Sequence, residues 1–103
     1  MQTITTLAEL LQASAQHSKI VIDAYTDWCG PCKVMSPIFE GMAKRFPTIV
    51  FYKVNCDEAE SALVLKLEIA NLPTFVLVSD GAVVNKVIGA NREALQNMLK
   101  QHS

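Results

Sequence analysis

Two strand-like segments on either side of a helical segment constrain the fold of this chain most. The segments KIVIDAY (residues 19–25) and TIVFYKV (residues 48–54) are apolar and rich in β-branched side chains, as strands buried on both faces of a sheet are. Between them, apolar residues recur at helical spacing as far as Pro47: Val34, Met35, Ile38, Phe39, Met42 and Phe46. The pattern predicts a βαβ unit, in which two parallel strands are joined by a right-handed crossover.

A short strand and a helix are predicted before this unit. Residues 1–5 suit an edge strand, and Thr6 with Glu9 forms a capping box that predicts a helix to about residue 17. The inner face of this helix is expected to carry Leu7, Leu10 and Leu11.

A helix, a hairpin and a last helix are predicted after the unit. Asp57 and Glu60 are expected to cap a short helix whose inner face carries Ala62, Leu63 and Leu67. Residues 74–78 and 82–89 resemble the strands of a β-hairpin around Ser79-Asp80-Gly81. Asn91 is expected to cap the last helix, whose buried face carries Leu95, Met98 and Leu99. The predicted order is therefore β-α-β-α-β-α-β-β-α.

Length and charge narrow the class of protein. The chain has 103 residues, half of them hydrophobic, which suits one domain over residues 1–103 with one core. The net charge of −1 comes without a basic stripe, so nucleic acid is not an expected partner. The apolar runs are too short to span a bilayer, and the first residues lack the basic start and apolar stretch of a secretory signal. We therefore expect a cytoplasmic protein that does not insert into membranes.

The segment DWCGPCK (residues 27–33) holds two of the three cysteines. A structural zinc site usually needs four ligands, and only Cys56, His17 and His102 remain, with no second close pair among them. A disulfide-stapled secreted domain would carry more cysteines, in an even number. The counts disfavour both of these sites and favour a redox-active pair, Cys29 and Cys32.

The predicted elements place this pair at a strand end and a helix start. A helix N-terminus offers free N–H groups and the positive end of the helix dipole, which stabilise a thiolate. Cys29 is expected to be exposed and to attack, and Cys32, one turn into the helix, to be buried and to resolve. Gly30 and Pro31 bridge them, and a proline is tolerated in a first helical turn.

Trp-Cys-Gly-Pro-Cys-Lys in this position resembles the signature of the thioredoxin family. The resemblance extends over essentially the whole chain through Asp23, Pro37, Lys53, Leu72-Pro73-Thr74, Gly81 and Gly89. It implies the thioredoxin fold, an α/β architecture with a mixed central sheet of five strands flanked by four helices. The last hairpin is then antiparallel to the other strands.

The resemblance also implies an activity and partners. It points to a general protein-disulfide reductase that carries out dithiol–disulfide exchange and is regenerated by a thioredoxin reductase. No cofactor and no metal is expected beyond the Cys29–Cys32 disulfide. The expected partners are disulfide-containing client proteins, and the chain is expected to be a monomer.

Two charged residues lie in the apolar strands. Asp23 could be an aspartate near a strand end that reaches water, but the resemblance implies that it manages the proton of the buried thiol, usually through water. Lys53, on the strand expected beside that of Asp23, could equally be a surface lysine with an apolar stem. If Lys53 lies close to Asp23, its positive charge is expected to favour the charged form of that carboxyl group.

Client binding is implied around Trp28, Leu72, Pro73, Thr74 and Gly89. Trp28 could be a packed core ring, but its place beside the nucleophile favours a partly exposed wall of the client groove. Pro73 could be a loop proline that begins a strand. The resemblance instead implies a cis-proline that faces the cysteines, beside backbone that pairs with an extended client segment.

Other residues receive structural expectations. Cys56 is expected to be a small buried hydrophobe at a strand end, and a regulatory thiol is the alternative. The chain departs from the family pattern at four positions, which bear on client preference, reductase pairing and core packing: Ala24, Tyr25, Leu67 and Asn71.

Two other functions use the same fold. A disulfide oxidant or isomerase is disfavoured by Pro31, because such members more often carry a histidine there. The other alternative is a non-catalytic binding subunit, which the intact cysteine pair with Asp23 neither requires nor forbids.

Overall fold

The order of elements is the predicted one. The computed structural model describes residues 1–103. Its elements are β1 (Gln2–Thr3), α1 (Leu7–Gln16), β2 (Lys19–Tyr25), α2 (Gly30–Met42), β3 (Val50–Asn55), α3 (Ser61–Lys66), β4 (Thr74–Ser79), β5 (Ala82–Ile88) and α4 (Arg92–His102). No helix has the length and apolar character needed to cross a membrane.

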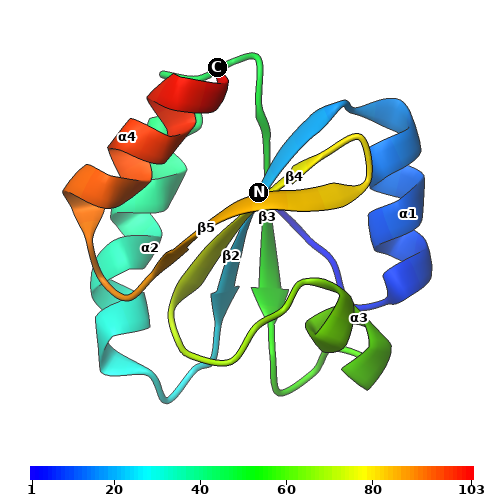
Figure 1. Ribbon diagram of the computed structural model, residues 1–103. Coiled ribbons are helices and arrows are strands. Elements are labelled where there is room, and N and C mark those ends of the chain that lie inside the picture. Colours follow the sequence, from blue (N-terminus) through cyan, green and yellow to red (C-terminus); the bar gives the residue numbers. More distant parts are fainter.

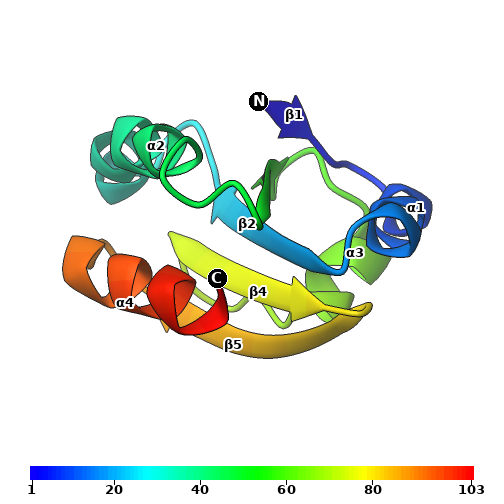
Figure 2. The same ribbon diagram turned by 90° about the horizontal axis from the view of Figure 1, so that it is seen from above.

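The five strands form one mixed sheet in the order β1-β3-β2-β4-β5. Strands β1, β3 and β2 pair in parallel, and β4 and β5 run antiparallel to them. In Figure 1 the arrowheads of β2 and β3 end at the same edge of the sheet, from which α2 departs. Seen from above, α2 and α4 lie on one side of the sheet and α1 and α3 on the other (Figure 2). The predicted thioredoxin fold, with its parallel βαβ unit and antiparallel hairpin, is confirmed.

Both faces of the sheet are packed, which explains the unbroken apolar runs. On β2, Val21 contributes to the cluster under α2 and α4, whereas Ile20 and Ile22 contribute to the cluster under α1 and α3. Phe39 of α2 lies at the centre of the first cluster, with ring centroids 4.9 Å from Phe51 and 5.5 Å from Phe75. Because successive strand residues point to opposite faces, a central strand needs apolar side chains at nearly every position.

The predicted capping box and the predicted last cap are both present. The Thr6 side chain accepts a hydrogen bond from the Glu9 amide, and the Glu9 carboxylate accepts from the Thr6 amide, both at 3.0 Å. Asn91 accepts from the Ala94 amide at 2.9 Å. The hairpin turns through Asp80 and Gly81, which both have positive φ, a conformation that glycine adopts without strain.

The start of α3 differs from the prediction. Its N-cap is Glu60, and no side chain caps it. Asp57 lies in the turn that follows β3, where its amide donates to the Asn55 side chain at 3.0 Å. Its carboxylate accepts a hydrogen bond from the Trp28 side chain. The prediction that Asp57 caps α3 is therefore wrong, because a residue distant in the sequence binds its side chain.

Three residues expected on the buried faces of helices are exposed to solvent, and one helix is shorter than expected. Leu11 is 52% and Val34 63% exposed, and Ala62 is exposed as well, because each lies at the margin of an apolar stripe whose centre already covers the sheet. Helix α2 ends at Met42 and not near Pro47, and a turn carries the chain on to Phe46.

Candidate active site

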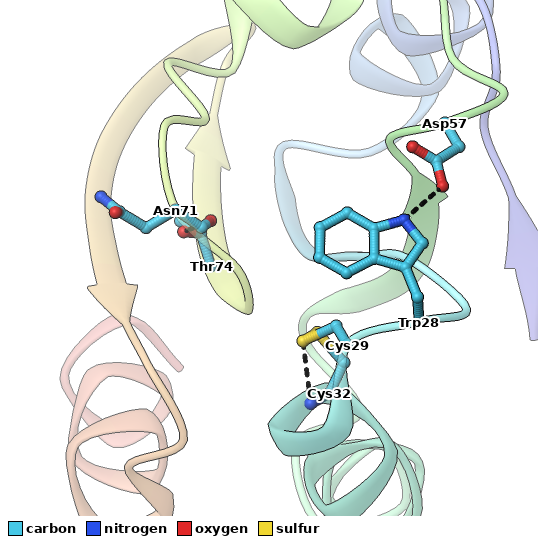
Figure 3. Close-up of a disulfide and its surroundings, with 6 residues drawn as sticks. All are labelled: Trp28, Cys29, Cys32, Asp57, Asn71 and Thr74. Carbon is cyan, nitrogen blue, oxygen red and sulfur yellow. Dashed lines mark hydrogen bonds between the residues drawn. A yellow bond between two sulfur atoms is a disulfide. The ribbon is translucent and has the colours of Figure 1, made fainter.

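Cys29 and Cys32 form a disulfide at the N-terminus of α2, with their Cα atoms 5.3 Å apart. Cys29 is the N-cap residue, and its Sγ accepts a hydrogen bond from the Cys32 amide at 3.2 Å (Figure 3). This amide is one of the helix N–H groups that have no partner within the helix. The predicted position of the pair, after a central strand and at the start of a helix, is confirmed.

The expected exposure of Cys29 needs a correction. Cys29 is 6% exposed and Cys32 is 2% exposed, so both residues are buried, with Cys29 the more accessible. In this oxidised state the Cys29 sulfur is bonded to Cys32 and faces the first turn of α2. Cys29 precedes the helix as its N-cap residue, whereas Cys32 lies within the helix.

The residues between and after the cysteines serve the helix start. Gly30 and Pro31 occupy the first turn of α2 and are exposed. A proline costs nothing there, because the N–H group that it lacks would have no helical partner. Lys33 is exposed, and Pro37 lies inside the helix.

Asp23 is buried in β2 without a hydrogen-bond partner. It is 1% exposed, and both carboxyl oxygens lack a partner in the protein. Burial raises the pKa of Asp23 from 3.8 to about 6, Lys53 opposes this increase, and Glu40 adds to it. The alternative of an aspartate that reaches water is wrong, because the side chain is buried. Its removal from water disfavours the charged form and is the largest cause of the raised pKa.

Lys53 is paired with Asp23 in the sheet but not through its side chain. The two residues are Cα partners on β2 and β3. The Lys53 ammonium donates to Ser36 Oγ at 2.5 Å and lies 3.7 Å from Glu40 Oε2, both on α2. It also lies 5.0 Å from the ring centroid of Tyr25. The sequence analysis did not find Ser36 and Glu40, because a serine and a glutamate on a helix form no motif, and only their i, i+4 spacing could have drawn attention to them.

Trp28 lies on the surface beside the cysteine pair. It is 71% exposed, and its Nε1 donates to Asp57 Oδ2 at 2.8 Å (Figure 3). This bond links the segment before α2 to the turn after β3 and holds the indole in one orientation. The core alternative for Trp28 is wrong, and its partly exposed position is confirmed.

The segment before β4 lies across from the disulfide. The Leu72–Pro73 peptide bond is cis, as predicted. Figure 3 shows Asn71 and Thr74 on the opposite side of the site from Trp28 and Cys29. The Thr74 hydroxyl donates to the Asn71 carbonyl at 2.6 Å.

Backbone contacts join this segment to the end of the hairpin. The amide of Gly89 donates to the Pro73 carbonyl at 2.8 Å. Gly89 has a φ of 94°, which favours glycine. Pro73 is buried and Leu72 half-buried. Thr74 pairs with Ala24, near the end of β2 that leads to the cysteines, and with Ile88 of β5. Leu72, Pro73, Thr74 and Gly89 therefore lie at the cysteine end of the sheet.

Cys56 is a free, half-buried thiol that follows β3. Burial, with smaller contributions from Asp57 and Asp23, raises its pKa above the usual thiol value. A raised pKa lowers the thiolate fraction, so the site does not activate this cysteine. The structure contains no group of three or more His, Cys, Asp or Glu side chains that could hold a metal ion.

Comparison with known proteins identifies the family to which this chain is similar. The thioredoxin family model matches residues 3–101. The chain is 39% identical over 97 residues to Thioredoxin-3, mitochondrial, of Saccharomyces cerevisiae, covering 94% of this chain and 76% of that protein.

Solved structures agree over the whole chain. A Plasmodium falciparum thioredoxin superposes with a TM-score of 0.93 at 32% identity and full coverage of both chains. A chain from a study of thiol resolution in yeast mitochondrial 1-Cys peroxiredoxin via glutathione/thioredoxin systems has a TM-score of 0.91 at 37% identity, with 98% and 94% coverage. With its redox disulfide at the helix start and its cis-proline opposite, the chain belongs to the thioredoxin family, whose members are thiol–disulfide oxidoreductases.

Proposed function

We propose that Cys29 and Cys32 pass two electrons to client disulfides, so that the chain works in the reducing direction. The observation that carries this proposal is the position of Cys29 as N-cap of α2, where its sulfur accepts the Cys32 amide hydrogen bond. In the reduced protein the same N–H group and the positive end of the helix dipole stabilise a Cys29 thiolate.

The reaction has two exchange steps. The Cys29 thiolate attacks one sulfur of the client disulfide, which forms a mixed disulfide and releases the other client sulfur as a thiolate. The Cys32 thiolate then attacks the Cys29 sulfur, which forms the Cys29–Cys32 disulfide and releases the second client thiol. Cys32 suits the second step because it is 2% exposed and does not meet a client directly. A thioredoxin reductase returns the pair to the dithiol.

Asp23 is proposed as the base that takes the proton from Cys32. A general base works best when its pKa lies near the pH at which the enzyme operates. The pKa of about 6 brings Asp23 closer to neutral pH than an exposed aspartate. Its burial in the central strand, without another partner, supports this role.

The client is proposed to bind between Trp28 and the segment at Pro73. Trp28 offers an exposed apolar ring on one side, and the cis-proline segment with Leu72 and Thr74 borders the site on the other. The Gly89–Pro73 backbone bond braces this second wall. An extended client segment would add to the sheet here by main-chain hydrogen bonds, with its disulfide over Cys29.

We also propose a monomeric, cytoplasmic protein. A dithiol that reduces clients has to be kept reduced itself, which the cytosol favours. Because the yeast relative is mitochondrial, cell fractionation decides this point. The peroxiredoxin named in the yeast study makes oxidised peroxiredoxins a class of client to test first.

Insulin reduction tests the function. With dithiothreitol or a thioredoxin reductase as electron donor, the wild-type protein should accelerate insulin precipitation, and Cys29→Ser should abolish this acceleration. An inert wild-type protein would favour the binding-subunit alternative. A redox titration against glutathione separates the reductase from an oxidant or isomerase, which would have the higher reduction potential.

A further inference from the structure

Asp23 and Lys53 lie opposite each other in the sheet, but their side chains form no ion pair with each other. They are Cα partners on the parallel strands β2 and β3, so their side chains leave the same face of the sheet. Yet neither oxygen of Asp23 has a hydrogen-bond partner, and the ion pair of Lys53 is with Glu40. A buried carboxylate beside an amine would normally take that amine as its partner.

The ammonium of Lys53 is held by a connected set of groups. It donates to Ser36 Oγ at 2.5 Å, and Ser36 Oγ donates in turn to Glu40 Oε2 at 3.1 Å. Glu40 Oε2 also lies 3.7 Å from the ammonium. Ser36 and Glu40 are four residues apart on α2, so they lie on one face of the helix and together form a polar anchor.

We propose that Ser36 and Glu40 are positioning residues, which hold the Lys53 ammonium against α2 and out of contact with the Asp23 carboxylate. The inference rests on the base role proposed for Asp23. An ammonium in contact with a carboxylate favours its charged form and makes it a weaker base. The anchor therefore keeps Asp23 able to accept the Cys32 proton near neutral pH.

Few other charges face Asp23. The charges that act on it are those of Lys53 on β3 and Glu40 on α2. Burial, and to a smaller extent the Asp23 charge, raises the pKa values of the Tyr25 phenol of β2 and the Cys56 thiol after β3. Both are neutral at neutral pH, and the paired residue on β4 is Phe75. Lys53 is thus the one cation whose position decides the field at Asp23.

The direct test is the titration of Asp23 in the oxidised protein, followed by carboxyl ¹³C NMR. Release of Lys53 by Ser36→Ala with Glu40→Gln should lower the Asp23 pKa by about 1, the lower end of the effect of an adjacent opposite charge. Ser36→Ala alone should lower it by less. In a Lys53→Met background, Ser36→Ala should have no effect, and Ser36→Ala with Glu40→Gln should lower the Asp23 pKa by less, because only the direct effect of the Glu40 charge remains. An equal fall of the pKa in that background overturns the inference. An Asp23 pKa that stays the same or rises in the double variant overturns the inference.

A control variant tests whether the loss of any surface carboxylate changes the Asp23 titration. Glu68→Gln removes the carboxylate of another 3.7 Å ion pair, with Lys86, away from Asp23. It should leave the Asp23 titration unchanged. An equal fall with Glu68→Gln would show a general charge effect and overturn the anchor.

The rate of mixed-disulfide resolution gives a second readout. In the double variant its acid limb should move to lower pH, and the limiting rate should fall about two- to threefold, because a weaker base transfers the proton less readily. A pH profile that coincides with that of the wild type overturns the inference. If Asp23→Asn resolves as fast as wild type, the base role itself fails, while the NMR titration still decides whether the anchor positions Lys53.

Discussion

Replacement of Asp23 by asparagine should stabilise the oxidised protein and slow its reaction. The carboxyl group is 1% exposed, and its pKa rises from 3.8 to about 6, chiefly through burial. The folded protein therefore holds this proton more tightly than the unfolded chain does. Asp23 opposes folding increasingly as the pH rises from 3.8 to about 6, and above that its cost is constant.

The magnitude follows from the two pKa values. A difference of about two pH units corresponds to about 3 kcal/mol at pH 8, and to about 1.5 kcal/mol at pH 5, where the folded group is mostly protonated already. Asparagine has nearly the same shape and no charge, so Asp23→Asn should raise the free energy of unfolding by up to these amounts. The loss of attraction to Lys53 reduces the gain.

Denaturant melts of both proteins at pH 5 and pH 8 measure this difference, with client turnover measured alongside. We expect a larger gain in stability at pH 8 and a slower resolution step, because Cys32 would lose the group that takes its proton. A variant that is less stable at both pH values, or that turns over clients as fast as wild type, would refute the reasoning and make Asp23 a structural residue.

Three further predictions concern other residues. Cys32→Ser should accumulate mixed disulfides with clients, whereas Cys29→Ser should accumulate few, and equal trapping in mass spectrometry of captured complexes would contradict the assigned roles. Cys56→Ala should leave turnover within about twofold, under about 0.5 kcal/mol on the barrier, since this thiol is half-buried and outside the disulfide; a tenfold loss in a folded variant would assign it a role. Thr6→Ala should destabilise the protein by about 1 kcal/mol in denaturant melts through loss of the α1 cap, with unchanged turnover; an unchanged midpoint would mean that the capping box adds nothing.

Local pattern and chemistry were enough to find the redox pair and the main elements. The apolar run of β2 and the helical spacing after it placed Cys29 at a strand end and a helix start, because both periodicities reflect burial of neighbouring residues. The cis bond before Pro73 was a different case. Nothing local distinguishes it from a trans proline at the start of a strand, and only the family resemblance predicted it.

Distant partners decide contacts that the local sequence does not reveal. Asp57 has the sequence context of a helix cap, but its carboxylate accepts from Trp28, 29 residues away along the chain. Lys53 does lower the pKa of Asp23, as expected, but its ammonium is bound by Ser36, 17 residues away, and not by the Asp23 carboxylate. Local propensity describes what a side chain can do, and the packing of the elements decides which partner is within reach.

The sequence by itself determined the order of strands and helices, the parallel βαβ unit and the position of Cys29 and Cys32 at a helix start. These features depend on periodicity and on residues near one another along the chain. Only the tertiary structure decided the environment of the site: the burial of Asp23 without a partner, the capture of Lys53 by α2 and the orientation of Trp28. These depend on distances between elements, and a pKa or a hydrogen bond responds to such distances and not to the order of residues.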